Sequence, residues 1–468
     1  MKIDVNHLPP VIVGAGPAGL AAAGTFLQAG VAPLILDEAD AAGGQGTRRL
    51  GPLAEPRMNA LFGTRYAARV RDRETVEDAI LAQSNYRPLT TIWGVYDKRL
   101  EVFAGDRLSN IPFQHLLLCT GATDRILPVA GWTLPGVYTL GGAQVALKKH
   151  GTFIGRKIVF AGSSPLLYLA AAQYLRLGAR DLVIVDSTSL FEKIKAAPAM
   201  ARWSAGTLFE GLRLLQELQR AGVRIIFGAD LLEIQGSTKV EHITFRRRGH
   251  PVETVACDAV AIGHGLRPET QLAELAGAQF EFDAEHGQWF PATDMDGRAS
   301  EDLWVAGDAA RTVGAIGAKV SGALAALSVL REMGITLLPE NRVKSMRGQL
   351  RRWRKFQHAM ARAFIPPVAA AAEAPDTMIL CRCERVIAAE IRQAVAQAAG
   401  PAEINRVKAI TRCGMGRCQG RYCGFALQSL LSSLTNKGAG NVGRLRAQAP
   451  VRPIPLVAAD SGSNDGKI

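Results

Sequence analysis

Residues 11–37 read VIVGAGPAGLAAAGTFLQAGVAPLILD, and this stretch decides the fold. The apolar run 11–13 predicts a short buried strand, and residues 20–29 predict a helix that ends at Gly30. Residues 33–36 predict a second strand. A strand, a glycine-rich turn, a helix and a second strand in this order predict a dinucleotide-binding βαβ unit.

Each glycine of the turn has its own physical role. Gly14 permits the tight turn, Gly16 lets the backbone approach a pyrophosphate, and Gly19 lets the helix pack closely on the strand. The N-terminus of the helix then faces the phosphates. Asp37 closes the second strand, where a carboxylate accepts hydrogen bonds from a ribose hydroxyl.

Three later segments favour FAD over NAD as the bound dinucleotide. Residues 43–45 are Gly-Gly-Gln, residues 116–121 read LLLCTG, and residues 303–310 read LWVAGDAA. All three resemble segments of the FAD domains of disulfide and thioredoxin reductases, and they occur in the same order. The candidate FAD-binding residues are Gly14, Gly16, Pro17, Ala18, Gly19, Asp37, Glu38, Gly44, Gln45, Thr120, Gly121, Gly307 and Asp308.

Residues 157–186, KIVFAGSSPLLYLAAAQYLRLGARDLVIVD, repeat the strand, turn, helix and strand and end on Asp186. The second and third glycines of the first turn are replaced here by Ser164 and Leu167. A Cβ atom at position 164 obstructs close approach to a pyrophosphate, and a leucine at 167 changes the packing of helix on strand. We expect this second dinucleotide fold to be kept while NAD(P) binding is lost or altered.

The chain offers no set of residues for acid–base or dithiol catalysis. Cys119 and Cys257 stand alone, so a thioredoxin-reductase dithiol is excluded. His264 lies in AIGHGLRP, which resembles the strand that returns the chain to the FAD domain, and a lone histidine there is more often structural than catalytic. We assign no catalytic residue, and the expected sites are cofactor sites.

Composition bounds the class of protein. The 468 residues suffice for two or three domains, and 48% hydrophobic with 21% charged residues excludes a disordered chain. No secretory signal and no apolar run of about 18 residues is apparent, so we expect no transmembrane segment. A cytoplasmic protein, at most peripheral to a membrane, is expected.

The formal net charge is +13, and much of the excess gathers in one segment. Residues 342–355, RVKSMRGQLRRWRK, carry seven basic residues and no acids. They form either a docking face for an acidic partner or anionic cofactor, or a solvated helix face. Nucleic-acid binding is not expected, because aromatic residues are sparse and no recognition motif accompanies the charge. Pro366, Pro367 and the alanine-rich stretch to Pro375 predict a linker.

Five of the seven cysteines gather near the C-terminus. Cys381 and Cys383 precede a predicted amphipathic helix, and Cys418 and Cys423 precede another. Two such pairs, separated by a helical hairpin, can bring four sulfurs to one centre, and four thiolates suit a [2Fe–2S] cluster or zinc. The cluster is favoured because the chain already carries a flavin; zinc remains the alternative.

The segment from Ile379, whose second half reads GMGRCQGRYC, resembles the bacterioferritin-associated-ferredoxin-like [2Fe–2S] domain. That resemblance implies the metal ligands Cys381, Cys383, Cys418 and Cys423. Cys413 falls where the pattern does not demand cysteine, so it is not expected to be a ligand.

VGAGPAG, GGQ, CRCE, GMGRCQGRYC and the tail VGRLRAQAPVRPIPL together resemble one family across nearly the whole chain. These are the larger, A- or α-type subunits of heteromeric FAD-dependent amino-acid and opine dehydrogenases. The family includes the A-type chain of opine oxidase, the hydrogen cyanide synthase B subunit and D-hydroxyproline or proline dehydrogenase α subunits. The sarcosine oxidase α subunit is a more distant relative.

The resemblance implies a division of labour between subunits. A D-amino-acid-oxidase-like β subunit with its own FAD oxidises the C–N bond of an amino acid or opine, of octopine, nopaline, D-hydroxyproline, proline or glycine type. Electrons then pass to this chain, in some relatives through FMN at the subunit interface, and a small ferredoxin-like [2Fe–2S] subunit is common. Two competing hypotheses are a self-sufficient NAD(P)H-dependent reductase and a non-catalytic metal-binding interaction protein.

The expected fold is an α/β flavoprotein with two dinucleotide-binding domains and a small, mostly α-helical C-terminal [2Fe–2S] domain. The expected divisions are residues 1–150 with 291–335 for the FAD domain, 151–290 for the degenerate NAD(P)-type domain, 336–376 for the basic helix and linker, 377–437 for the [2Fe–2S] domain, and 438–468 for the tail.

Overall fold

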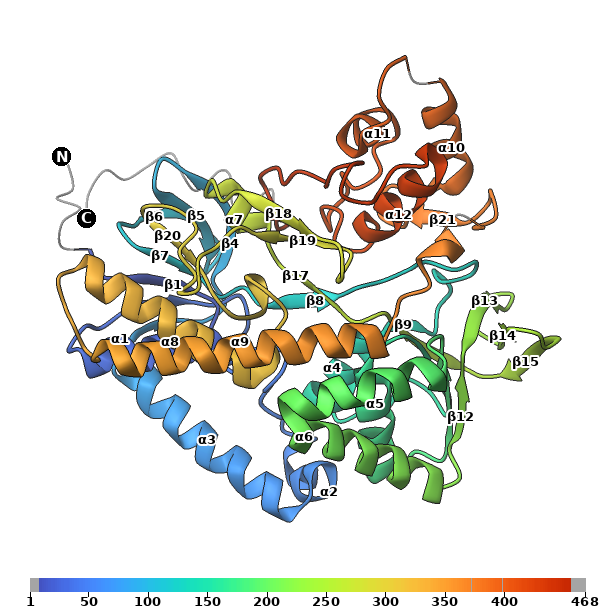
Figure 1. The fold of residues 1–468 in the computed structure, drawn as a ribbon, viewed down its shortest axis with the longest axis horizontal. Coiled ribbons are helices and arrows are strands. Elements are labelled where there is room, and N and C mark those ends of the chain that lie inside the picture. The colour runs from blue at the N-terminus through green and yellow to red at the C-terminus, as the bar shows by residue number, and fades with distance from the viewer. Residues whose placement is uncertain (1–7, 372, 398, 456–468) are drawn as a thin grey trace.

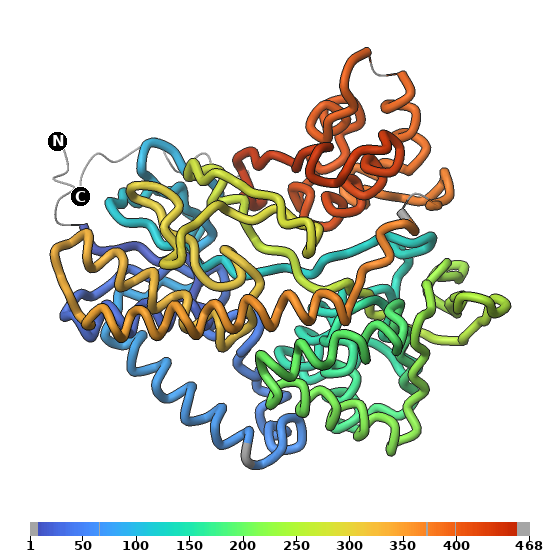
Figure 2. The backbone as a smooth tube through the Cα atoms, viewed as in Figure 1, coloured from blue at the N-terminus to red at the C-terminus, as the bar shows by residue number. Residues whose placement is uncertain are grey.

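The computed structural model describes residues 8–455, apart from residues 372 and 398 (Figure 1). The first seven residues of the predicted FAD domain and the predicted tail beyond residue 455 lie outside the described residues. The chain path in Figure 2 shows that the blue start and the yellow segment share one unit, that a cyan and green unit adjoins it, and that the red C-terminal part forms a third.

The first unit is built on a five-stranded parallel sheet with the order β20-β7-β1-β2-β3. Its central strands are continuous runs of Val, Ile and Leu that are buried on both faces, as parallel strands usually are. The strands are β1 (Val11–Val13), β2 (Leu34–Leu36), β3 (Asn85–Arg87), β7 (Leu116–Leu118) and β20 (Leu303–Val305).

Two helices, α1 (Pro17–Gln28) and α8 (Gly314–Glu332), pack against each other in the core of this unit. Helix α1 begins three residues before the predicted start, because Pro17 has the fixed φ that suits a first helical position. Among the described helices, only α8 is long and apolar enough to cross a membrane by length and composition. More than half of it is buried inside the protein, as in an ordinary core helix.

The second unit contains another five-stranded parallel sheet, with the order β12-β11-β10-β16-β9. Its strands are β9 (Val137–Thr139), β10 (Lys157–Gly162), β11 (Asp181–Asp186), β12 (Arg224–Phe227) and β16 (Ala259–Gly263). Its helices are α4 (Leu140–His150), α5 (Pro165–Arg176) and α6 (Leu190–Arg220).

Sheet pairing and packing divide the chain differently from the expected boundaries. Strand β9 pairs with β16 in the second sheet, although it precedes residue 151. Conversely, Leu272 and Phe280 pack into the core of the first unit, although the sequence division placed residues 151–290 together.

Smaller antiparallel sheets decorate and connect the two units. They are formed by β4 (Thr91–Tyr96), β5 (Arg99–Ala104) and β6 (Arg107–Pro112); by β13 (Ala229–Gln235), β14 (His242–Arg247) and β15 (Val252–Ala256); by β8 (Ala122–Asp124) with β17 (Leu266–Pro268); and by β18 (Phe280–Asp283) with β19 (Gln288–Pro291). The remaining helices of these units are η2 (Glu55–Arg57), α2 (Met58–Phe62), α3 (Thr64–Ala82), α7 (Gln271–Leu275), η3 (Gly307–Ala309) and η4 (Val368–Ala371).

The basic segment lies within one long helix, α9 (Glu340–Ala363), which crosses the front of the molecule in Figure 1. Its buried side packs on α8 at one end and on α6 at the other. Helix α9 therefore braces the two dinucleotide-type units against each other.

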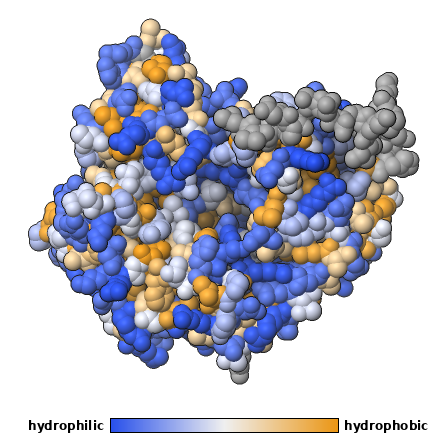
Figure 3. Space-filling model, turned by 180° about the vertical axis from the view of Figure 1, so that it is seen from behind, coloured by the Kyte–Doolittle hydropathy of each residue, from blue (hydrophilic) through white to orange (hydrophobic). Residues whose placement is uncertain are grey.

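The C-terminal unit is small and mostly helical. It contains β21 (Ile379–Cys381), β22 (Val386–Ile387), α10 (Ala388–Gln397), α11 (Ile404–Thr411) and α12 (Gly424–Thr435). After α12 the chain returns to the first unit, where Val451 is buried and donates its N–H to the carbonyl of Trp93 at 2.9 Å. The tail thus ties the C-terminal unit to the first sheet. Figure 3 shows the opposite face, where polar and apolar residues intermix around a central hollow.

Candidate flavin and iron–sulfur sites

The loops that follow β1, β2, β7 and β20 gather the sequence-predicted flavin residues at one edge of the first sheet. Ligands of open α/β sheets bind outside the carboxyl ends of the strands, so this is the edge where a dinucleotide is expected. The predicted residues lie there in four groups: Gly14, Gly16, Pro17, Ala18 and Gly19 after β1; Asp37, Glu38, Gly44 and Gln45 after β2; Thr120 and Gly121 after β7; and Gly307 and Asp308 after β20.

Glycines form a shelf of bare backbone at the N-terminus of α1. Gly14 has φ +103°, and a Cβ atom there would lie 2.4 Å from the carbonyl oxygen of Cys119. A Cβ atom on Gly44 would lie 3.0 Å from the Cα atom of Gly16, so two backbones meet here without side chains. A Cβ atom on Gly16 itself would have no neighbour closer than 3.8 Å. This open shelf, facing backbone N–H groups at a helix N-terminus, suits a pyrophosphate.

Asp37 is buried and already holds the turn together. Its Oδ2 accepts a hydrogen bond from the N–H of Ala15 at 2.5 Å, and its Oδ1 accepts one from Ala39 at 2.7 Å. Burial raises the pKa of Asp37, and these two N–H groups oppose that rise. The neighbouring Glu38 is exposed and pairs with Arg452 of the tail at 2.9 Å. The acid at the end of β2 therefore positions the glycine turn, whatever else it binds.

The last two predicted groups are also anchored by hydrogen bonds. Asp308 accepts from the N–H groups of Val313 at 2.7 Å and Gly314 at 2.9 Å, and burial raises its pKa. A Cβ atom on Gly307 would lie 2.7 Å from the Cβ of Ala18, so this loop lies directly against α1. Asp308 is thereby fixed between the start of α8 and the glycine shelf.

The second dinucleotide fold uses its own side chains where a nucleotide ribose would bind. Asp186, at the end of β11, is fully buried and accepts hydrogen bonds from the Tyr168 hydroxyl at 2.6 Å and the Thr188 N–H at 2.8 Å. Lys193 forms an ion pair with the same carboxylate at 2.8 Å, and its ammonium lies 3.7 Å from the ring centroid of Phe364. Because both carboxylate oxygens are engaged, the usual ribose acceptor is occupied from within the chain.

His264 is buried beside the same sheet. Its Nδ1 lies 3.1 Å from the hydroxyl of Ser163, and burial lowers its pKa to about 3. It therefore stays neutral at physiological pH and fills the interior, in keeping with a structural residue.

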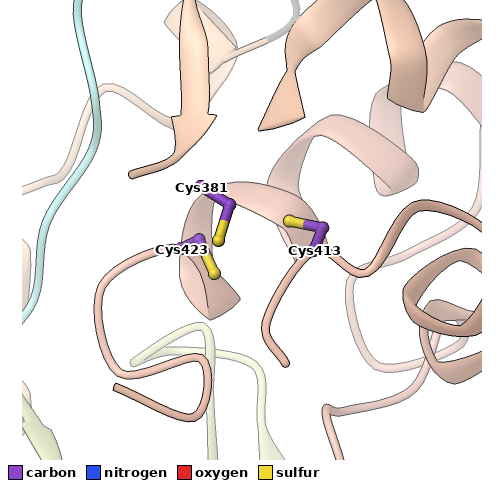
Figure 4. A group of neighbouring side chains, drawn as sticks. All are labelled: Cys381, Cys413 and Cys423. Carbon is purple, nitrogen blue, oxygen red and sulfur yellow. The ribbon is translucent and has the colours of Figure 1, made fainter. Parts of the chain in front are cut away.

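Five cysteines converge in the C-terminal unit. The Sγ atoms of Cys381, Cys413 and Cys423 lie within 4.8 Å of one another, and Figure 4 shows the three sulfurs turned toward each other. Cys383 and Cys418 form a second pair through a hydrogen bond between their side chains. In the sequence, Cys381 lies near Cys383 and Cys418 lies near Cys423. In the fold, Cys381 lies beside Cys423, and Cys383 lies beside Cys418.

The three thiols of the first group are hydrogen-bonded to one another. Cys413 and Cys423 donate hydrogen bonds to the sulfur of Cys381, which lowers the pKa of Cys381 to about 2 and raises the pKa of both donors. Four or more thiol groups in one buried place, with one already favouring the thiolate, fit a [2Fe–2S] cluster or another thiophilic metal. Cys413, left out of the expected ligand set, thus lies inside the sulfur group.

A buried arginine from the first unit contacts the cysteine loop. Arg267, in β17, donates from Nη1 to the carbonyls of Gly420 and Arg421, both at 2.9 Å. Burial lowers the pKa of Arg267, and the thiol groups of Cys418 and Cys423 act on it in the opposite direction. A cation therefore lies next to the loop that carries two of the sulfurs.

A buried ion pair links that loop to the predicted flavin residues. Glu269 holds Arg421 in a bidentate pair, at 2.6 and 3.0 Å, with both side chains 8% exposed. The backbone of Glu269 also accepts from the Thr120 hydroxyl at 2.6 Å and donates to the Gly121 carbonyl at 2.9 Å. One residue thus contacts both the strand end expected to hold the flavin and the loop between Cys418 and Cys423.

Sequence reasoning missed Arg267, Glu269 and Arg421. Roughly 150 positions separate the first two from the cysteine loop, and no spacing rule connects them. Two weak signals were present in the sequence. Residues 266–269, LRPE, lie just after a predicted strand, and Arg421 stands between the expected ligands Cys418 and Cys423.

Comparison with known proteins agrees with this geometry. Residues 9–328 match the family model described as pyridine nucleotide-disulphide oxidoreductase. The chain belongs to this family. Residues 379–433 match the BFD-like [2Fe-2S] binding domain.

Relatives match nearly the whole chain. It is 34% identical over 461 residues to the A-type chain of opine oxidase from Rhizobium meliloti (strain 1021), covering 95% of this chain and 97% of the relative. It is 31% identical over 464 residues to hydrogen cyanide synthase subunit HcnB of Pseudomonas aeruginosa, covering 97% and 98%. The α subunit of sarcosine oxidase from Rhizobium meliloti is 28% identical over 72% of this chain and 32% of that protein.

Among solved structures, L-proline dehydrogenase from P. horikoshii aligns with a TM-score of 0.68 at 21% identity, covering 96% of this chain and 78% of that one. This likeness and the family models confirm the expected fold class. The relatives and the family models confirm the oxidoreductase class, and the family models confirm the cofactors FAD and [2Fe–2S]. The relatives are named as subunits of enzymes.

Proposed function

We propose that this chain is the FAD- and [2Fe–2S]-containing electron-transfer subunit of a heteromeric dehydrogenase that oxidises the C–N bond of an amino acid or opine. When bound, FAD accepts electrons in pairs and the [2Fe–2S] cluster takes them singly. The observation that carries the proposal is Glu269, which touches the Thr120–Gly121 strand end and grips the cysteine loop through Arg421. The Glu269–Arg421 pair is thus a buried contact between the two cofactor regions.

The substrate site is assigned to a partner. The described part of this chain gives no acid–base set beside the flavin edge, where Asp37 and Asp308 are engaged by backbone N–H groups. We propose a β subunit similar to D-amino-acid oxidase, with its own FAD, for octopine, nopaline, D-hydroxyproline, proline or glycine. FMN at the subunit interface and a small ferredoxin-like third subunit complete the proposed complex, which we place in the cytoplasm.

We keep Cys381, Cys383, Cys418 and Cys423 as the proposed cluster ligands. Cys381 lies with Cys423 and Cys383 lies with Cys418, so each pair supplies two thiolates from two different loops. Cys413 then acts as a donor to the sulfur of Cys381 rather than as a ligand. Hydrogen bonds to cluster sulfurs are one of the features that tune cluster potential.

Serine substitutions separate these roles. Cys418→Ser should abolish the paramagnetic signal of the reduced cluster, while Cys413→Ser keeps a hydrogen-bond donor and should retain it. Cys413→Ala should also retain the cluster but lower its midpoint potential, since the donor is lost. An unchanged signal in Cys418→Ser, or a lost signal in Cys413→Ser, would refute the assignment.

The competing function is a self-sufficient NAD(P)H-dependent reductase, and the internal partners of Asp186 argue against it. The test is anaerobic reduction of the bound flavin, followed by its visible absorbance. We expect NADH and NADPH to leave the flavin of the isolated chain oxidised. In the complex with the partner encoded beside it, one of the five amine substrates should bleach the flavin. Rapid bleaching by NADH in the isolated chain would overturn the proposal.

A further inference from the structure

Helix α6 is kinked at Ser204 and exposes large apolar side chains on both sides of the kink, which together are called the apolar stripe here. Five of the eighteen large hydrophobic side chains that are exposed in the described residues lie on this helix. They are Leu190, Phe191, Ile194, Phe209 and Leu212, each between 46% and 69% exposed. In the first segment of the helix, before the kink at Ser204, the exposed positions Pro198 and Ala201 continue the spacing of Phe191 and Ile194 and are also apolar.

The stripe is not needed for packing within the chain. The other side of α6 buries Ala196 and Met200 against Phe356 and Ala359 of α9. An exposed helix face with apolar residues at successive turns marks an interaction site more often than a solvated surface.

A strongly basic pocket opens beside this stripe, between α6 and α9. Its volume is about 490 Å³, and it is lined by Arg202, Trp203, Gly348, Arg351, Arg352 and Lys355. Trp203 forms the apolar wall, with the Lys355 ammonium 4.5 Å and the Arg202 guanidinium 5.4 Å from its ring centroid. Arg352 donates from Nε to the carbonyl of Trp203 at 2.6 Å, which holds the two helices together at this point.

The four cations of the pocket lack acidic partners among the described residues. On the same helix, Arg347 pairs with Asp296 and Glu340, and Arg362 pairs with Glu285, so acids are available where the fold requires them. Four like charges around one cavity repel each other unless an anion enters it. The unpaired positive charge of this pocket therefore favours the binding of negatively charged groups from outside the chain.

We infer that the α6–α9 face is the docking surface for the substrate-oxidising partner subunit, which inserts acidic side chains into the Trp203 pocket and covers the apolar stripe. This inference rests on the proposed function for the existence of that subunit. The kink at Ser204 divides α6 into two helical segments, and the exposed apolar side chains of both segments lie on the helix that packs against α9. An aromatic and arginine-rich centre is the usual composition of an interface hot spot.

A protein partner fits this face better than a lipid surface. The cations line an open, shallow pocket between two packed helices and surround Trp203, whereas a helix that lies on a membrane carries its cations along the rim of its polar face. Acidic side chains of a protein partner can pair with the cations of both helices at once.

The test measures assembly of the chain with the partner subunit encoded beside it, by size-exclusion chromatography and by the dissociation constant. The double variant Arg351→Glu with Lys355→Glu and the single variant Phe209→Asp should each weaken assembly at least tenfold. Wild-type affinity should fall as salt rises, and this dependence should shrink in the charge variant. Flavin absorbance and melting temperature report that the variants are folded.

Two matched controls carry the same chemical change elsewhere. Arg248→Glu changes an exposed arginine in the β14–β15 turn, and Val76→Asp changes a 60% exposed side chain on α3. Both should assemble within twofold of wild type. The inference is wrong if either α6–α9 variant assembles with wild-type affinity. It is also wrong if either variant loses binding to phosphatidylglycerol vesicles while it still assembles with the partner normally. Failure of the wild-type chain to assemble with the partner at all overturns the proposed function as well.

Discussion

At the scale of single residues, Glu269 joins the Thr120–Gly121 strand end to the loop between Cys418 and Cys423. Its partner Arg421 is buried with it, so removing the carboxylate charge leaves an uncompensated guanidinium. Breaking one partner of a buried pair typically costs about 3–5 kcal/mol. We expect Glu269→Gln to lower the melting temperature by several degrees. The control Glu281→Gln alters a half-exposed carboxylate on Arg311 and should change little; equal melting temperatures for both variants would contradict the role of Glu269.

The same pair gives a pH dependence with a definite sign. Burial alone would raise the pKa of Glu269, but the Arg421 guanidinium holds it below its usual value. The stabilisation is therefore present above the unfolded pKa of glutamate, about 4.3, and is lost as the pH falls through the depressed folded value. The difference in free energy of unfolding between wild type and Glu269→Gln should stay constant from pH 8 to pH 5 and shrink below about pH 4. A difference that grows on acidification would refute this.

Arg267 supplies the second prediction at this scale. Its buried cation lies against the loop that bears Cys418 and Cys423, and a nearby positive charge favours the reduced, more negative cluster. We expect Arg267→Gln to lower the midpoint potential of the cluster by roughly 50 mV, close to the 59 mV that represents a tenfold shift for one electron. Arg267→Lys should retain most of the wild-type potential. Equal potentials in all three proteins, measured by redox titration with EPR, would exclude an electrostatic role.

The candidate residues near the glycine turn could be predicted from sequence because each has a local spacing. The loops of Gly14, Asp37, Thr120 and Asp308 follow short apolar strands, and parallel strands bring their carboxyl ends to one edge. Glu269 and Arg421 could not be found in this way, since their contact depends on how two separate units dock.

At the scale of elements, the second dinucleotide unit keeps the strand, helix and strand of the first without its turn glycines. Strand β10, helix α5 and strand β11 repeat the first unit, but Leu167 is now fully buried where a glycine would allow closer packing. The sequence predicted this unit from its periodicity. It did not predict that Tyr168 and Lys193 would engage Asp186, because helix positions alone do not say which side chains reach the strand end.

A substitution at Leu167 tests this account of the second unit. Leu167→Ala should destabilise the protein by about 2–5 kcal/mol, the usual cost of truncating a buried leucine, and should not confer NADH oxidation. Chemical unfolding and flavin absorbance under anaerobic NADH measure the two effects. The surface variant Leu89→Ala, at a 63% exposed position, provides the control. NADH reduction of the flavin in Leu167→Ala would show that packing, and not the occupied Asp186, had blocked the nucleotide.

At the scale of the whole molecule, several connections hold the C-terminal unit against the rest of the protein, and three of them lie in different places. They are the Glu269–Arg421 pair, the bond from the Trp132 indole to the carbonyl of Ile379 at 2.6 Å, and the tail that buries Val451 in the first core. The types of the elements and their order were predictable from the sequence. The unit to which β9 and residues 266–290 belong was not, because strand pairing and packing in the assembled fold decide it.

The most direct test of the central claim follows both cofactors of the assembled complex after anaerobic addition of its amine substrate. Rapid-freeze EPR with parallel absorbance should show the flavin bleaching first and the reduced [2Fe–2S] signal rising afterward at a matching rate, with the second step slowed in Glu269→Gln. A cluster that stays oxidised beside a fully reduced flavin would contradict the account.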